Sequence, residues 1–150
     1  MKIYKQSNSN LMKTTFLFII GMIIGSWSYA QTTNLTIEVT NFKNTDGKLR
    51  VALFNSEGTY LKDSQYTSDT LVYSQELVKV SFTGLPNGEY AISIYHDQND
   101  NGELDANFMG IPTEPYAFSN NAKGRFGPAS YADSKFSLNQ SNQIHSIQLN

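Results

Sequence analysis

Residues 97 to 105, which read DQNDNGELD, place oxygen-bearing side chains at a spacing that suits a bound cation. Calcium prefers about six to eight oxygen ligands, and one loop can supply most of them from alternating positions. If Asp97 is the first ligand, Gly102 falls at the sixth position, where a calcium loop turns sharply. The pattern therefore predicts a calcium loop with the ligands Asp97, Asn99, Asn101, Glu103 (through its carbonyl) and Asp105.

The second half of this loop departs from the EF-hand pattern. The twelfth position holds Phe108 instead of a bidentate glutamate, so an EF-hand is excluded, and Glu114 or Asp133 would have to complete the shell. So few carboxylates predict weak binding, with a dissociation constant on the order of 10⁻⁴ to 10⁻³ M. The same residues also suit a metal-free turn, because Asp and Asn bond to backbone groups two residues on, and Asn101 with Gly102 is a strong turn pair. Both interpretations stay open on the sequence.

A hydrolase site built on His96 and the loop carboxylates is a third interpretation of this region. Neighbouring residues of a strand point to opposite faces, so His96 and Asp97 do not form a dyad, and the only other histidine is His145. No G-x-S-x-G motif is present. We expect His96 to bond to the loop backbone, which favours a protein without enzymatic activity. The carboxylates open to a hydrolase would be Glu103, Asp105 and Glu114.

The long stretch from residue 97 to residue 134 has little periodicity and is rich in Asn, Gly and Pro. A structureless segment of this length is uncommon in a compact domain, so it is either functional or contains an unrecognised strand. Its aromatic side chains indicate that it packs onto the domain, where such residues commonly cover the open end of a sandwich. Alternatively, residues between 108 and 131 bind a carbohydrate, a peptide or a hydrophobic ligand through Tyr116, Phe118, Arg125, Phe126 and Tyr131.

The segments that position this region alternate apolar and polar residues with a period of two, which is typical of antiparallel β-strands. Between the first two of them, Asp46 and Gly47 supply the left-handed conformation that a hairpin favours. The pattern predicts an all-β fold, an antiparallel β-sandwich with one long loop-rich insertion near 97–134. The alternating segments are residues 33–42, 48–54, 77–83, 89–96 and the tail 141–150.

The sequence FTGLPNGEYAISIYHD contains a turn between two of these alternating segments. Pro86 fixes φ, Gly88 is free to take a positive φ, and Leu85 and Tyr90 are expected to pack beneath the turn. This segment resembles the L-P-x-G-x-Y turn of prealbumin-like β-sandwiches, such as carboxypeptidase regulatory domains and bacterial surface repeats. The resemblance implies a Greek-key, immunoglobulin- or prealbumin-like sandwich of the kind that serves as a stalk, spacer or binding module.

Five separated motifs occur in order after residue 85, at residues 88–91, 96–105, 110–114, 118–121 and 126–128. Together they resemble the bacterial domain of unknown function 2141. With the two N-terminal strands, the resemblance covers almost all of the chain after residue 30. It implies an extracytoplasmic β-sandwich with no assigned activity, and it supplies no catalytic residues.

Residues 1–30 have the features of a secretory signal peptide. Lys2, Lys5 and Lys13 precede the apolar run FLFIIGMIIG, and SYA places small residues before a cleavage site after Ala30. The apolar run is shorter than the about 20 residues of a membrane span. We therefore expect residues 31–150 to form a single secreted or periplasmic domain with no stable membrane span.

The cysteine content and net charge of this domain exclude several kinds of binding site and partner. The chain has no cysteine, which excludes a disulfide framework, a thiolate zinc site and a lipid-modified cysteine. Without the three N-terminal lysines, 8 of the 11 basic residues face 13 acidic ones, a net charge of about −5. There is no basic run, so nucleic acid is not an expected partner. The sequence predicts a non-enzymatic secreted or periplasmic module that meets an extracellular ligand or a component of the cell envelope.

Overall fold

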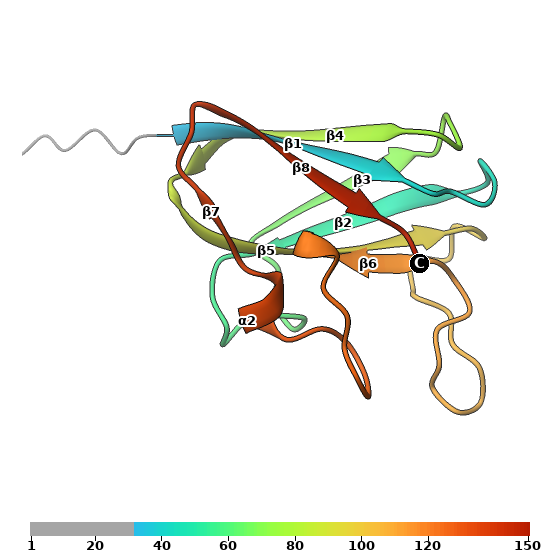
Figure 1. Ribbon diagram of the computed structural model, residues 1–150. Helices are drawn as coiled ribbons and strands as arrows, with labels where there is room; N and C mark the ends of the chain where they lie inside the picture. The colour runs from blue at the N-terminus through green and yellow to red at the C-terminus, as the bar shows by residue number, and fades with distance from the viewer. Residues whose placement is uncertain (1–31) are drawn as a thin grey trace, which may run out of the picture. The chain divides into compact units, whose positions relative to one another are not determined.

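The computed structural model describes residues 32–150, which are dominated by β-strands (Figure 1). The predicted signal peptide lies outside the described residues. Two short helices, η2 (Ser119–Asn121) and α2 (Tyr131–Ser134), accompany the strands in this part of the chain. The strands are β1 (Thr32–Thr40), β2 (Lys48–Phe54), β3 (Tyr66–Leu71), β4 (Val78–Pro86), β5 (Gly88–Asp97), β6 (Tyr116–Phe118), β7 (Phe136–Leu138) and β8 (Asn142–Gln148).

The strands form two facing sheets, the upper and lower layers of Figure 1. One sheet has the order β4–β1–β8, and the other has the order β3–β2–β5–β6 with β7 beside the first residues of β5. The all-β, sandwich-like fold expected from the sequence is confirmed. Purely antiparallel pairing is wrong for one pair, because β1 and β8 run parallel. The chain reaches β8 at the end of the sandwich where β1 begins, and the Asn34 N–H donates to the Ser141 carbonyl there.

The core lies between the sheets and is built from the alternating apolar residues. Leu35, Ile37 and Val39 of β1 are fully buried, and the matching residues of the other central strands face them across the core. Each such side chain contributes about 1.5–3 kcal/mol when removed from water. The core residues of the other strands are Leu49, Val51, Leu53, Val78, Val80, Leu85, Tyr90, Ile92, Ile94, Ala117, Leu138 and Ile147, together with Leu149 just after β8.

The predicted hairpin between the first two strands is wrong. β1 pairs with β4 and β8, whereas β2 pairs with β3 and β5. A hairpin would leave both strands in one sheet, but the connection after β1 crosses to the other sheet, so that the apolar faces of β1 and β2 oppose each other. The left-handed turn itself is present, because Gly47 has φ 64°.

The turn formed by Pro86, Asn87 and Gly88 also joins the two sheets, since β4 and β5 belong to different layers. Leu85 and Tyr90 are buried beneath it, as expected. The Tyr90 hydroxyl donates to the Pro86 carbonyl at 2.9 Å. A tyrosine that bonds back to the backbone a few residues upstream fixes a corner between sheets in the same way in immunoglobulin-like sandwiches.

Three strands, β3, β6 and β7, were not expected from the sequence. The insertion contains β6, which pairs with the middle of β5 and divides the stretch into shorter loops. β3 reads YTSDTL, and its residues alternate between half-buried and exposed because it lies at the edge of its sheet. Such an edge strand lacks the apolar face that makes a strand recognisable.

Replacement of Gly47 by alanine is expected to lower the free energy of unfolding by about 2 kcal/mol or more. The positive φ disfavours a side chain there, and a methyl group would overlap the Asp97 carbonyl. Urea unfolding measures the change. Gly58→Ala is the matched control, because no atom lies within 4 Å of the added methyl group, and it should stay within about 0.5 kcal/mol of the parent. Equal losses of unfolding free energy for the two substitutions would contradict the role given to Gly47 in the connection between β1 and β2.

Candidate functional site

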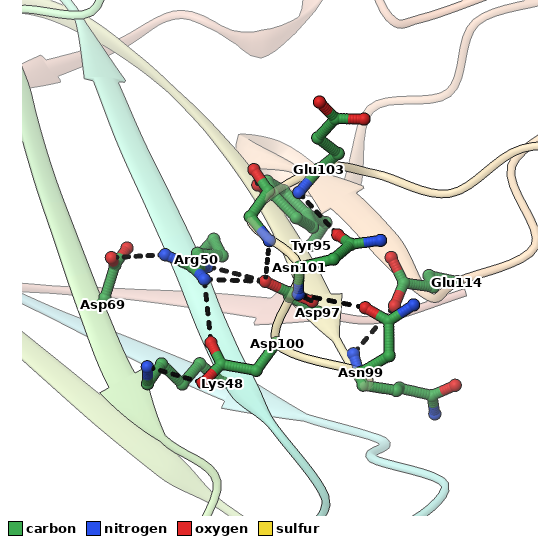
Figure 2. Close-up of polar contacts among 12 residues, drawn as sticks. Lys48, Arg50, Asp69, Tyr95, Asp97, Asn99, Asp100, Asn101, Glu103 and Glu114 are labelled. Atoms are coloured by element: carbon green, nitrogen blue, oxygen red, sulfur yellow. Dashed lines mark hydrogen bonds and ion pairs between the residues drawn. The ribbon is translucent and has the colours of Figure 1, made fainter.

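The acidic loop begins at an ion pair between β2 and the end of β5 (Figure 2). The alternation that turns Leu49 and Val51 to the core turns Arg50 to the outer face, where Asp97 also points. Arg50 Nε and Nη2 lie 2.9 and 2.8 Å from Asp97 Oδ2. The Asp97 side chain is fully buried at 0% exposure, so this is a carboxylate removed from water and neutralised by one guanidinium.

Backbone groups of the loop complete the surroundings of Asp97. The Asn101 N–H donates to Oδ1 at 3.1 Å, and the Gly102 N–H donates to Oδ2 at 2.9 Å. Burial alone would raise the pKa of Asp97. The hydrogen bonds from Gly102 and Asn101 and the pairing with Arg50 outweigh it, so the pKa is lowered from 3.8. The ionised form of Asp97 is therefore favoured in the folded protein.

Arg50 also connects the loop to its surroundings. Its Nη1 lies 2.6 Å from Asp69 Oδ2 in β3, and its Nη2 lies 2.9 Å from Asp100 Oδ1. Lys48 Nζ binds the other oxygen of Asp100 at 2.8 Å. These outer pairs are partly exposed, and such pairs add little stability individually. Their effect is to place two cations of β2 against the first turn of the loop.

The remaining loop side chains cap their own backbone. Asn99 Oδ1 accepts from the Asn101 N–H at 3.1 Å, and Asn101 Oδ1 accepts from the Glu103 N–H at 2.8 Å. The amide groups of Asn99 and Asn101 donate to the two Asp105 oxygens at 2.7 and 3.1 Å. The side-chain oxygens of the predicted ligands Asp97, Asn99, Asn101 and Asp105 thus already accept hydrogen bonds. Glu103 contributes its backbone, and its side chain is exposed.

Glu114 holds the loop closed from the other side. Its side chain is buried, and its two oxygens accept from the Gln98 N–H at 2.8 Å and the Asp105 N–H at 3.1 Å. One carboxylate therefore binds both ends of the loop. Asp133, the other residue expected to complete a calcium shell, instead accepts from the Ser130 hydroxyl at 2.5 Å beside α2.

His96 faces the interior, opposite to Asp97. Its ring is fully buried, its Nε2 lies 2.6 Å from the Asp46 carbonyl, and the Phe42 ring meets it edge-on at 5.3 Å. A neutral imidazole that donates from Nε2 satisfies that carbonyl. His96 therefore fixes a loop backbone as expected, although the loop is 41–47 rather than the acidic one.

The five residues predicted to bind a ligand fall in three places. Tyr116 and Phe118 of β6 lie 5.9 Å apart, ring to ring, and line a groove of about 510 Å³ with Lys123 and Asn150. Arg125 and Phe126 stand exposed on the loop before α2. Tyr131 is buried against Tyr60, with ring centroids 5.6 Å apart. The structure therefore brings together only the first pair as part of one hollow.

Arg50 is the main residue of this site that sequence reasoning missed. The alternation of β2 indicates that its side chain points away from the core. Its partner Asp97 is 47 residues away in the sequence, and only the register that places β2 beside β5 brings the two together.

The two facing sheets, the sheet-crossing tyrosine corner and the self-capped loop define an all-β sandwich domain with an organised loop at the end of β5. Residues 37–146 match the family described as "Uncharacterized protein conserved in bacteria (DUF2141)", and the chain belongs to this family. No curated protein and no solved structure matches the chain. Among residues 32–150, no helix has the length and apolar character needed to cross a membrane.

Asp97→Asn is expected to lower the free energy of unfolding by about 3 kcal/mol at neutral pH, because it breaks a buried ion pair. The pKa of Asp97 is lower in the folded than in the unfolded chain, so its stabilisation is present above the unfolded value and lost as the pH falls through the folded value. The variant should lack this part of the acid dependence. Urea unfolding between neutral pH and pH values below 3.8 measures both effects.

Asp69→Asn is the matched control, since it removes a more exposed carboxylate from the same guanidinium. It should cost at most about 1 kcal/mol. Equal losses for the two variants, or an unchanged acid dependence in Asp97→Asn, would contradict the assigned role of the buried pair.

Proposed function

We propose that this protein is a non-enzymatic, extracytoplasmic β-sandwich module whose long loop is organised by its own side chains. The observation that carries the proposal is the Asp97 carboxylate, which Arg50 and two backbone N–H groups satisfy completely. The signal-like residues 1–30 support an extracytoplasmic location.

The positions of the ionisable groups support a role without catalysis. A general base must come within hydrogen-bond reach of its substrate. His96 and Asp97 are both fully buried; His96 Nε2 binds the Asp46 carbonyl, and the Asp97 carboxylate is paired with Arg50. Glu114, the third carboxylate considered for a hydrolase, is buried and occupied by backbone donors. A structural use of all three side chains accounts for these contacts.

The loop geometry favours the self-capped turn over the calcium site. A cation at this loop must compete with the Arg50 guanidinium for its first ligand, and like charges at short range repel. It must also displace the amide hydrogen bonds on both Asp105 oxygens. Calcium binding stays a prediction of the sequence, and we propose that the loop keeps its conformation without it.

Thermal melts in excess EDTA, in millimolar calcium and in millimolar magnesium separate the two interpretations. We expect the three melting curves to superimpose, because the loop donors and acceptors are already paired. A rise specific to calcium, growing with concentration as RT ln(1 + [L]/Kd), would contradict the proposal. If such a rise were lost in Asp105→Asn and kept in Asp133→Asn, it would assign a calcium site to the loop.

The groove beside β6 supports a second candidate function, that of a ligand-binding module. Its volume of about 510 Å³ lies in the range of small-molecule sites, and Tyr116 supplies an aromatic wall with amide groups nearby. Asn41 and Asn121 contribute these amide groups together with Asn150. Aromatic faces and amides are the groups that commonly recognise sugars and peptides.

Thermal shift measurements with a panel of oligosaccharides and short peptides test this function. A ligand of the groove should raise the melting temperature of the parent protein and of Tyr73→Ala, which removes an exposed tyrosine elsewhere. Tyr116→Ala should abolish the rise. A rise that survives in Tyr116→Ala would place the ligand outside the groove.

A further inference from the structure

The two most exposed large hydrophobic side chains in residues 32–150 stand on two different loops. Phe126 is 99% exposed and Phe108 is 97% exposed. Met109 and Ile111, which follow Phe108, are 64% and 53% exposed. Single exposed apolar residues are ordinary. A group of them gathered at loop tips is a sign of an interaction surface.

The first tip is held in a defined shape by Asn107. Its side-chain oxygen accepts from the N–H groups of Met109 and Ile111 at 2.9 and 3.1 Å. Its backbone carbonyl accepts from the Gly110 N–H at 2.9 Å, and its N–H donates to the Ile111 carbonyl at 2.9 Å. These contacts close a tight turn and keep its apolar side chains in solvent, so exposure here does not come from a lack of structure.

The second tip is equally narrow and carries positive charge. Gly124 packs so closely on the carbonyls of Gly127 and Pro128 that a methyl group would overlap them. The chain folds back there and leaves Arg125 and Phe126 at the end of the loop. Lys123 and Arg125, like Lys43 and Lys62, form no ion pair with a described residue, whereas the cations at positions 48, 50, 79 and 135 each meet a carboxylate.

Both loops project from the sandwich on the side of the β2–β5 sheet, away from the sheet of β1, β4 and β8 (Figure 1). Among the acidic residues of the first loop, Asp100 is paired with Lys48 and Arg50, Glu114 is buried and Glu103 is exposed. The tip from residue 107 to residue 112 contains no charged residue. One side of an acidic domain thus presents an apolar tip and a cationic-aromatic tip.

We propose that these two tips dock the protein on the surface of an anionic lipid bilayer. Apolar side chains on projecting loop tips can enter the headgroup region, where aromatic rings are favoured. Lys123 and Arg125, which form no ion pair within residues 32–150, are available to bind the lipid phosphates. Juxtamembrane cations contribute to such binding through the negative surface potential. The rest of the chain after residue 30 has 6 basic and 13 acidic residues, a net charge of about −7, which favours an approach with the tips first. This role adds to the proposed module and does not depend on whether the loop binds calcium.

Flotation with vesicles tests the docking, using protein purified from cells that express the full chain. The parent should float with vesicles of phosphatidylglycerol and phosphatidylcholine, and more weakly with phosphatidylcholine alone. Phe108→Ser and Phe126→Ser should each reduce partitioning about tenfold. Lys123→Ser and Arg125→Ser should each reduce it about fivefold at low salt. Added salt should weaken binding of the parent more than that of the double cation variant.

Leu71→Ser is the matched control, because it removes another exposed apolar residue, which lies in β3. It should leave partitioning unchanged, and all variants should keep the parental melting temperature. Phe126→Trp adds a reporter, since Trp27 is the only tryptophan of the sequence. Its emission should shift to the blue on anionic vesicles and be quenched by brominated lipid. Absence of flotation, or equal losses in Leu71→Ser and the tip variants, would overturn the proposal and favour a protein partner for the tips.

Discussion

The pairing of Arg50 with Asp97 is the contact on which the organisation of the long loop depends. A carboxylate with no access to water is tolerated only when cations and hydrogen-bond donors surround it. Here one donor is a side chain of the neighbouring strand and two are backbone groups of the loop itself. The first turn of the loop therefore supplies part of the hydrogen bonding that stabilises the buried Asp97 carboxylate. If this turn opened, the carboxylate would lose two of its donors.

The end of β5 organises two loops because adjacent residues of a strand face opposite ways. His96 points inward and binds the Asp46 carbonyl, which fixes the crossing from β1 to β2. Asp97 points outward and fixes the acidic loop. The two arrangements meet at Gly47, which lies directly against the Asp97 carbonyl. A histidine next to an aspartate in the sequence suggests a catalytic pair. In this structure, the two side chains point in opposite directions, and each stabilises the backbone of a different loop.

Local patterns were enough to predict the faces of the strands but not their partners. The period of two in residues 33–42 predicted a strand with one apolar face, and Leu35, Ile37 and Val39 form that buried face, because burial of alternate residues is a property of each strand alone. Pairing is decided across the chain, so the turn at Gly47 was interpreted as a hairpin. The sequence pattern did not reveal β3, because a strand at the edge of a sheet needs few apolar residues.

In the site, the turn chemistry of Asn99 and Asn101 was foreseen as one of two alternatives, since it arises within nine residues of sequence. The partner of Asp97 was not foreseen, because Arg50 reaches it through a sheet register that no local motif encodes. One of the two alternatives for the aromatic residues between 108 and 131 was that they act together in binding a ligand. The structure separates them, because β6 and α2 draw Phe118 and Tyr131 into different packing environments.

The parallel pairing of β1 with β8 has a consequence for the order in which the chain can fold. The first described strand is central in its sheet, and one of its two neighbours is the last strand of the sequence. Contacts between such distant segments make folding slow, because the loop entropy is lost before the contacts form. The sheet also cannot be completed until the C-terminal residues are available. Under the extracytoplasmic location that we propose, this delay would keep the polypeptide unfolded until its whole length has crossed a membrane.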